Sequence, residues 1–105
     1  MTYKTAYSMA AVRDLDHIRT EIMSASQDTG TAEKYIASLM ERIEEKKFFP
    51  KSGSPLYYMD GFTGYYYVVY KAYIAFYRVD ENKVYIDRIL STKSDYMRVP
   101  RFRPQ

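Results

Sequence analysis

The stretch "GYYYVVYKAYIAFYRV", residues 64–79, contains six of the chain's thirteen tyrosines. Aromatic and β-branched residues favour extended structure, so the stretch predicts two strands, "GYYYVVY" and "YIAFYRV", separated by a turn at Lys71 and Ala72. Three uses compete for so many phenol rings: a sheet built from aromatic residues, a stacking platform for nucleic acid, or a surface for a partner. The flanking sequence narrows this choice.

The flanking residues predict one further strand on each side of this stretch. "LYYM", residues 56–59, precedes it, and "VYIDRIL", residues 84–90, follows it. "DENK", residues 80–83, suits a hairpin turn, because Asp and Asn hydrogen-bond locally and tolerate left-handed geometry. "FFPKSGSP", Phe48 to Pro55, predicts a loop. The second half of the chain is therefore expected to form an antiparallel meander.

The first half predicts a short strand and a helical hairpin. "TYKTAYS", Thr2 to Ser8, alternates polar and apolar residues, and Ser8 suits the N-cap of a helix that ends near Ala25. "SQDTG" breaks that helix, with Gly30 in a left-handed turn and Thr31 capping the next helix. Apolar residues recur at helical spacing in both segments: Val12, Leu15, Ile18 and Ile22, then Ala32, Ile36, Leu39 and Ile43.

These elements predict one α+β domain spanning residues 1–105, with the helical hairpin packed on one face of the antiparallel sheet. The chain has no cysteine, which excludes disulfides and thiolate metal sites and fits a reducing compartment. The N-terminus lacks the apolar core of a signal peptide, so we expect a cytoplasmic protein.

The positive charge is concentrated in a C-terminal tail, residues 92–105. From residue 93 onward it carries Lys93, Arg98, Arg101 and Arg103 against Asp95, a net charge of +3 that equals that of the whole chain. Such a tail, interleaved with aromatic rings, suits phosphate or an acidic protein segment. The alternative is a solvated terminus, because prolines prevent regular structure there.

No small-molecule chemistry is indicated elsewhere. His17 is the only histidine, and no second ligand or reacting partner accompanies it in the sequence. Glu41, Glu44 and Glu45 alternate with basic residues, which is typical of a solvated helix face. The chain lacks glycine-rich phosphate loops, nucleophile elbows and zinc spacings. We therefore expect no cofactor and no metal.

The tyrosines divide between the two faces of the predicted sheet. Tyr65 and Tyr67 share one face of their strand, and Tyr73 and Tyr77 share one face of the next. If Ile74 and Phe76 point toward the helices, Tyr73 and Tyr77 point away from them and enrich the open face in tyrosine. Such a surface suits stacking or a docked peptide, although cross-strand packing explains aromatic strands equally well.

The chain resembles the RelE/ParE superfamily of toxins from bacterial type II toxin–antitoxin modules. The resemblance rests on "DLDHI" and "TAEKYIASLMERI" in the helices, a "P..G" loop, and "YIAFYRVDENKVYIDRIL" in the meander, and it covers nearly the whole chain. It implies a small cytoplasmic toxin that a cognate antitoxin wraps and neutralises. The resemblance implies one of two mechanisms. RelE-like members of the superfamily cleave mRNA on the ribosome, and ParE-like members poison DNA gyrase.

The cations of both branches are absent from the meander. RelE-like nucleases place basic residues at positions that correspond here to Tyr65, Tyr67 and Ile74, and many ParE-like members place an arginine where this chain has Tyr66. Without cations a phosphate transition state lacks its clamp. We therefore favour a gyrase-directed, ParE-like toxin, with a ribosome-dependent endoribonuclease and a decayed toxin that only binds antitoxin as alternatives.

The resemblance and the residue patterns together give two sets of candidate site residues. A nuclease would rely on Lys93, Tyr96 and Arg98. Partner contacts are expected from tyrosines of the sheet and from arginines: Tyr65, Tyr67, Tyr73, Tyr77, Arg78, Arg88, Arg101 and Arg103.

Overall fold

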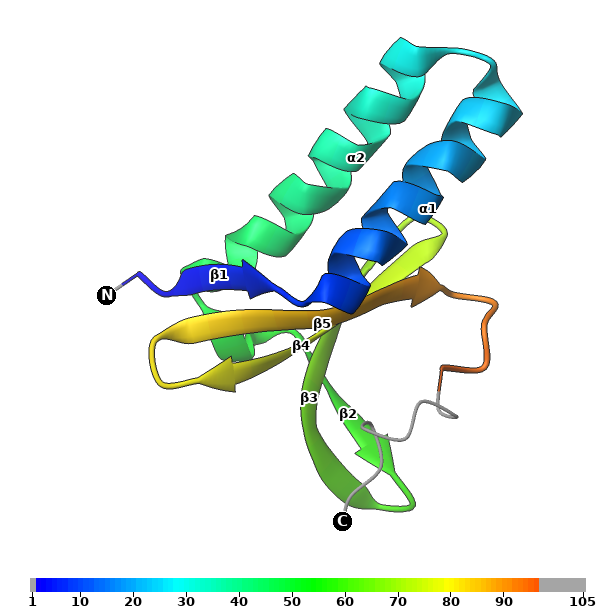
Figure 1. Cartoon of the computed structure of the whole chain (residues 1–105). Coiled ribbons are helices and arrows are strands. Elements are labelled where there is room, and N and C mark those ends of the chain that lie inside the picture. The colour runs from blue at the N-terminus through cyan, green and yellow to red at the C-terminus, as the bar shows by residue number, and fades with distance from the viewer. Residues whose placement is uncertain (1, 97–105) are drawn as a thin grey trace.

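The computed structural model describes residues 2–96. Two helices lie side by side over one face of a five-stranded sheet, and the hairpin of the second and third strands extends beyond them (Figure 1). The elements in chain order are β1 (Lys4–Tyr7), α1 (Met9–Ser26), α2 (Thr29–Glu44), the 3₁₀ turns η1 (Glu45–Lys47) and η2 (Pro50–Ser52), β2 (Ser54–Tyr58), β3 (Gly61–Tyr70), β4 (Tyr73–Asp80) and β5 (Lys83–Ser91). The predicted α+β architecture is confirmed.

The sheet has the strand order β1-β5-β4-β3-β2. β2 to β5 form the predicted antiparallel meander. β1 adds to its edge by pairing with β5 in parallel, from Lys4 opposite Lys83 to Tyr7 opposite Ile86. The helical hairpin lies between β1 and the meander in the sequence, which supplies the long crossover that parallel pairing needs. The sheet is therefore mixed.

Side-chain caps define the helix ends. The Ser8 Oγ accepts a hydrogen bond from the Ala11 N–H at 2.9 Å, so the predicted cap of α1 is correct. The predicted link to α2 is wrong: Gln27 is the left-handed residue, with φ of 57°, and Asp28 is the N-cap. The Asp28 carboxylate accepts from the Gly30 N–H at 3.1 Å, which satisfies a free donor of the first turn and places Gly30 inside the helix. Thr31 is likewise helical, and its hydroxyl donates to Asp28.

The main core lies between the helices and the sheet. Most residues of the predicted helical stripes are buried, but Ile22 is only partly buried. Val12 is 44% exposed, and its neighbour Ala11 is fully buried instead. The buried members of this core come from both helices and from β4 and β5: Ala11, Leu15, Ile18, Ile36, Leu39, Ile43, Tyr73, Ala75, Tyr77, Val84, Ile86 and Ile89.

The opposite face of the sheet, which we call the open face, carries a smaller cluster of Leu56, Tyr65, Ile74 and Phe76. Ile74 and Phe76 thus lie away from the helices, while Tyr73 and Tyr77 belong to the main core. The expectation that these two tyrosines enrich the open face is therefore wrong. The residues on both faces of β4 are apolar, and Tyr73 to Tyr77 are all buried. The residue types of this strand therefore do not show which face points toward the helices.

Polar side chains bind the part of β5 that extends past β1. The β4–β5 register skips Asp87, since Phe76 pairs with Arg88 and Tyr77 with Ile86. The Ser8 hydroxyl donates to the Asp87 carbonyl at 2.6 Å. The Asp14 carboxylate accepts from the Ile89 N–H at 2.9 Å. The side chains of α1 and its cap thus satisfy backbone groups that a neighbouring strand would otherwise pair.

Candidate functional site

The centre of the open face contains a hydrogen-bonded tyrosine and carboxyl group. The Tyr65 hydroxyl donates to the Asp87 Oδ2 at 2.7 Å, and both side chains are buried. The bulge in β5 brings Asp87 to this position, because its extra residue turns the side chain out of the regular alternation. Tyr65 is therefore occupied within the fold rather than presented to a partner.

Aromatic rings surround this pair. The Tyr96 ring lies 5.1 Å from the fully buried Phe76 ring, and the half-buried Tyr67 ring lies 6.3 Å from it. Ile74, Leu56 and Leu90 complete the cluster. On this face Tyr67, predicted to bind a partner, and Tyr96, predicted to serve a nuclease, are both partly accessible.

Arg78 is exposed on β4, opposite Tyr85 in the register. Its guanidinium lies 4.6 Å from the centre of the Tyr85 ring, a cation–π contact. Sequence reasoning placed Arg78 among the partner-binding residues, and its exposure leaves its charge available to solvent.

Tyr73 and Tyr77 instead hold the helix-covered side together. The Tyr73 hydroxyl donates to the Glu21 Oε2 at 2.7 Å, and burial raises the pKa of Tyr73 above its ordinary value. The Tyr77 hydroxyl donates to the Pro50 carbonyl at 2.6 Å and accepts from the Gly53 N–H at 3.1 Å. Burial raises the pKa of Tyr77 to about 12. Both rings are too buried to form a binding surface.

Arg88 joins β5 to α1. Its Nε and Nη2 donate to the two carboxylate oxygens of Asp14 at 2.8 and 3.0 Å. The hydrogen bond to Asp14 raises the pKa of Arg88 above its usual range. Because the guanidinium is committed to this two-pronged contact, Arg88 serves the fold more than a partner.

Of the C-terminal candidate residues, Lys93 and Tyr96 lie within the described part of the chain, in different surroundings. Lys93 is exposed in a turn after β5, where its N–H donates to the Ser91 Oγ at 3.1 Å, and Tyr96 returns to the open face. Arg98, Arg101 and Arg103 lie outside the described residues, so their predicted roles stay predictions.

Two features were missed by the sequence reasoning. One is the pairing of Asp14 with Arg88, which joins residues 74 positions apart and leaves no local pattern. The other is the exposed pair Phe48 and Phe49, treated as part of a loop although two adjacent exposed phenylalanines are unusual for a solvated segment.

Residues 2–96 contain neither a metal-binding cluster nor a membrane-crossing helix. No three residues of the His, Cys, Asp and Glu types come together there in a way that would hold a metal ion. Neither α1 nor α2 has the length and apolar content of a membrane-crossing helix.

The fold resembles solved toxin–antitoxin structures. A chain of the chromosomal ParDE system from P. aeruginosa superposes with a TM-score of 0.75, at 18% identity over 88% of this chain and 98% of the other. A chain of the RelBE2 toxin–antitoxin complex from Mycobacterium tuberculosis gives a TM-score of 0.62, at 21% identity over 87% and 99%. No match was found among curated proteins.

The strand, helical hairpin and meander, in this order, thus form a fold that the chain shares with both of these structures. The family model for the ParE toxin of the type II toxin–antitoxin system parDE matches residues 6–96, which is most of the chain. The chain therefore belongs to the ParE toxin family of type II toxin–antitoxin systems.

Proposed function

We propose that this toxin arrests growth by binding a protein target, DNA gyrase, and that a cognate antitoxin neutralises it. The membership of the ParE family supports the toxin role, and the similar solved structures are described as toxin–antitoxin systems. The gyrase target rests on the resemblance to the ParE-like branch.

The composition of the open face is the observation that carries this choice. An RNA-cleaving site needs cations beside the scissile phosphate. On the open face the Asp87 carboxyl group instead accepts a hydrogen bond from Tyr65, and the rings of Phe76 and Tyr96 are in contact. A carboxyl group and aromatic rings supply no positive charge, which favours a mechanism of protein binding over phosphate chemistry.

Expression of the toxin without its antitoxin tests the proposal. We expect growth arrest with filamentous cells and induced DNA damage, and inhibition of supercoiling when the purified toxin is added to DNA gyrase. Toxin mixed beforehand with an excess of antitoxin is the matched control and should leave gyrase active. Arrest with intact DNA and rapid loss of mRNA would overturn the gyrase target.

A ribosome-dependent endoribonuclease is the second candidate. The placement of Tyr96 on the open face, with the exposed Lys93 three residues earlier, favours it. Under this mechanism Lys93→Ala and Tyr96→Phe should each abolish mRNA cleavage on ribosomes while the circular dichroism spectrum stays unchanged. Cleavage that persists in both variants would remove these residues from the mechanism.

A decayed toxin is the remaining alternative. It predicts tight binding of the antitoxin without any effect of the toxin on growth, DNA or mRNA. A growth curve after induction, paired with an affinity measurement on the same purified chain, separates it from both active forms.

A further inference from the structure

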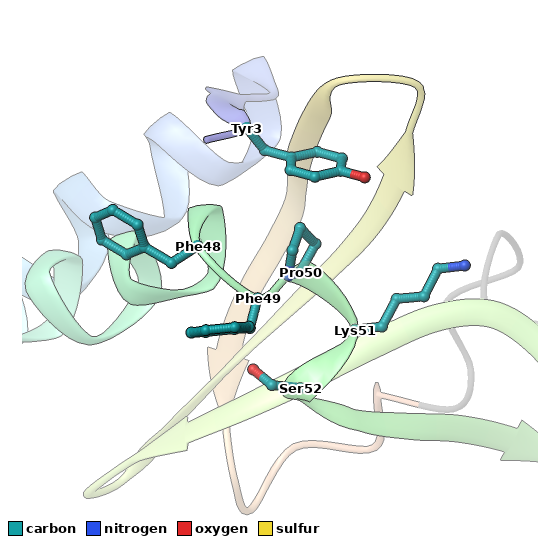
Figure 2. Close-up of a pocket in the computed structure, with 6 residues that line it drawn as sticks. All are labelled: Tyr3, Phe48, Phe49, Pro50, Lys51 and Ser52. Carbon is teal, nitrogen blue, oxygen red and sulfur yellow. The ribbon is translucent and has the colours of Figure 1, made fainter. Parts of the chain in front are cut away.

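A groove of about 520 Å³ lies where the chain passes from the end of α2 to β2. Figure 2 shows Tyr3, from the start of the chain, above Pro50, with Phe48 and Phe49 to the left and Lys51 extending to the right. We call it the aromatic groove, and its lining residues are Tyr3, Phe48, Phe49, Pro50, Lys51 and Ser52.

We propose that the aromatic groove is a docking site for one segment of the antitoxin, in which large apolar side chains are flanked by carboxylates. This inference rests on the proposed antitoxin partner and assigns it a place on the toxin.

The exposed rings provide the first argument. Phe48 is 55% exposed and Phe49 is 74% exposed, although the rest of the loop is anchored to the fold. Covering large apolar side chains removes their surface from water, which favours binding. Two adjacent rings at the side of a concave site are therefore a strong anchor point for apolar side chains of a partner.

The rigidity of the loop provides the second argument. The Tyr77 hydroxyl binds both Pro50 and Gly53, so a fully buried ring of the sheet holds the loop at two points. A Cβ atom added at Gly53 would lie 2.2 Å from the Tyr77 oxygen, so the loop approaches the ring as closely as a glycine allows. A site fixed in this way needs little ordering when a partner binds.

The positive charge near the groove indicates which kind of segment it would bind. The Lys46 Nζ donates to the Ser52 Oγ at 3.1 Å. The Lys47 Nζ lies 5.5 Å from the Phe48 ring centre but also 4.0 Å from the Glu44 Oε1, whereas Lys51 has no ion-pair partner within residues 2–96. Glu45 is exposed nearby, but Glu44 accepts hydrogen bonds from the Thr5 and Tyr7 hydroxyls. Lys51, the lysine that lines the groove, therefore complements a segment that carries carboxylates.

A single-stranded nucleic acid is the competing occupant, because rings and lysines also suit bases and phosphates. Its affinity depends on several phosphate contacts at once. Lys51 is the one lysine in the groove lining, and the remaining lining is aromatic, proline and hydroxyl side chains. These residues favour an apolar protein segment.

The test uses the full-length toxin and the purified protein encoded by the reading frame next to the toxin gene. A double variant, Phe48→Ser with Phe49→Ser, should weaken the complex at least about 100-fold, since about 1.4 kcal/mol corresponds to tenfold. Lys51→Glu should weaken it about tenfold, with a smaller loss at high salt. Isothermal titration calorimetry measures both affinities.

Matched controls keep the result specific. Met59→Ser removes an apolar side chain that is 83% exposed at the tip of the β2–β3 hairpin, and Lys34→Glu reverses a charge on the exposed surface of α2. Both should change the affinity less than about twofold. Unchanged thermal melting curves should accompany every variant, because none of the substituted side chains is buried.

Three outcomes would overturn the inference. If the double variant bound the antitoxin as tightly as the wild-type toxin does, the groove would not be part of the interface. The proposed function would remain intact in that case. If the double variant lost affinity for a 12-nucleotide single-stranded RNA but bound the antitoxin as the wild type does, the groove would be assigned to RNA. Failure of the wild-type toxin to bind at all would reject the proposed antitoxin partner together with its docking site.

Discussion

The two faces of the sheet use tyrosine in the same way but for different partners. On the helix-covered face, Tyr73 and Tyr77 direct their hydroxyls to Glu21 and to the loop before β2. On the open face, Tyr65 directs its hydroxyl to Asp87. In each case a ring fills the interior while its polar tip meets a polar group. The buried tyrosines of this chain thus serve to pack and hydrogen-bond the fold, and their abundance does not by itself indicate a binding surface.

The two faces of the sheet differ in which parts of the chain cover them. Two helices cover the larger core, whereas the smaller cluster on the open face is covered only by partly buried side chains that include Tyr67 and Tyr96. Substitutions of matched size on the two faces therefore separate the contribution of helix packing from that of the sheet alone.

The largest expected effect is on the helix-covered face. Tyr77→Ala should lower the free energy of unfolding by about 3–5 kcal/mol, because it removes a fully buried ring and both anchors of the loop. Phe76→Ala, also fully buried, should cost less, since Tyr67 and Tyr96 can move into its cavity. Urea denaturation measures both. A larger loss for Phe76→Ala would reverse the ranking of the two cores.

The contact between α1 and β5 should show the next effect. Asp14→Ala leaves the Arg88 guanidinium and the Ile89 N–H without their acceptor, at an expected cost of about 2–3 kcal/mol in thermal or urea unfolding. Asp16→Ala breaks an exposed pair with Arg19 on the same helix and should cost less than about 0.5 kcal/mol. Equal losses would show that burial does not set the strength of these pairs.

Alkaline pH should weaken the helix-covered face. The pKa of Tyr77 is raised to about 12 by burial, and that of Tyr73 is raised as well, so the unfolded chain loses these protons at lower pH than the folded one. Stability should therefore be fully present below about pH 10 and fall as the pH rises toward 12, by up to about 1.4 kcal/mol per pH unit for each such tyrosine. Tyr77→Phe should reduce this slope, as measured by urea denaturation across the range; an unchanged slope would exclude Tyr77 as a source.

The smallest effect is expected at the exposed margin of the open face. Arg78→Ala removes the cation–π contact with Tyr85 and should lower the free energy of unfolding by about 0.5 kcal/mol. Arg78→Lys should retain part of it. A loss above about 1.5 kcal/mol in either variant would mean that Arg78 carries more of the fold than its exposure indicates.

The elements of the fold were predictable because their signals are local. Apolar spacing located both helices, and aromatic and β-branched runs located the strands of the meander. The face assignment of β4 failed because Ile74 and Phe76 are as apolar as Tyr73 and Tyr77, and only the long-range register decides between them. The same limit hid the contact of Asp14 with Arg88, which depends on how α1 lies along β5.

The candidate site was predicted less completely than the fold. The lack of cations at Tyr65, Tyr67 and Ile74 was visible in the sequence. The bulge that places Asp87 under Tyr65 was not, since a register shift leaves no mark in the residue types. The exposure of Phe48 and Phe49 also depends on the Tyr77 anchor, which joins residues 24 and 27 positions apart.

The capped end of β5 also bears on how this chain behaves before it meets any partner. An unpaired strand edge recruits further strands, and two copies joined edge to edge can start an aggregate. Ser8 and Asp14 occupy backbone groups on the part of β5 that β1 leaves uncovered. Pairing of two copies through this part of β5 is thereby disfavoured.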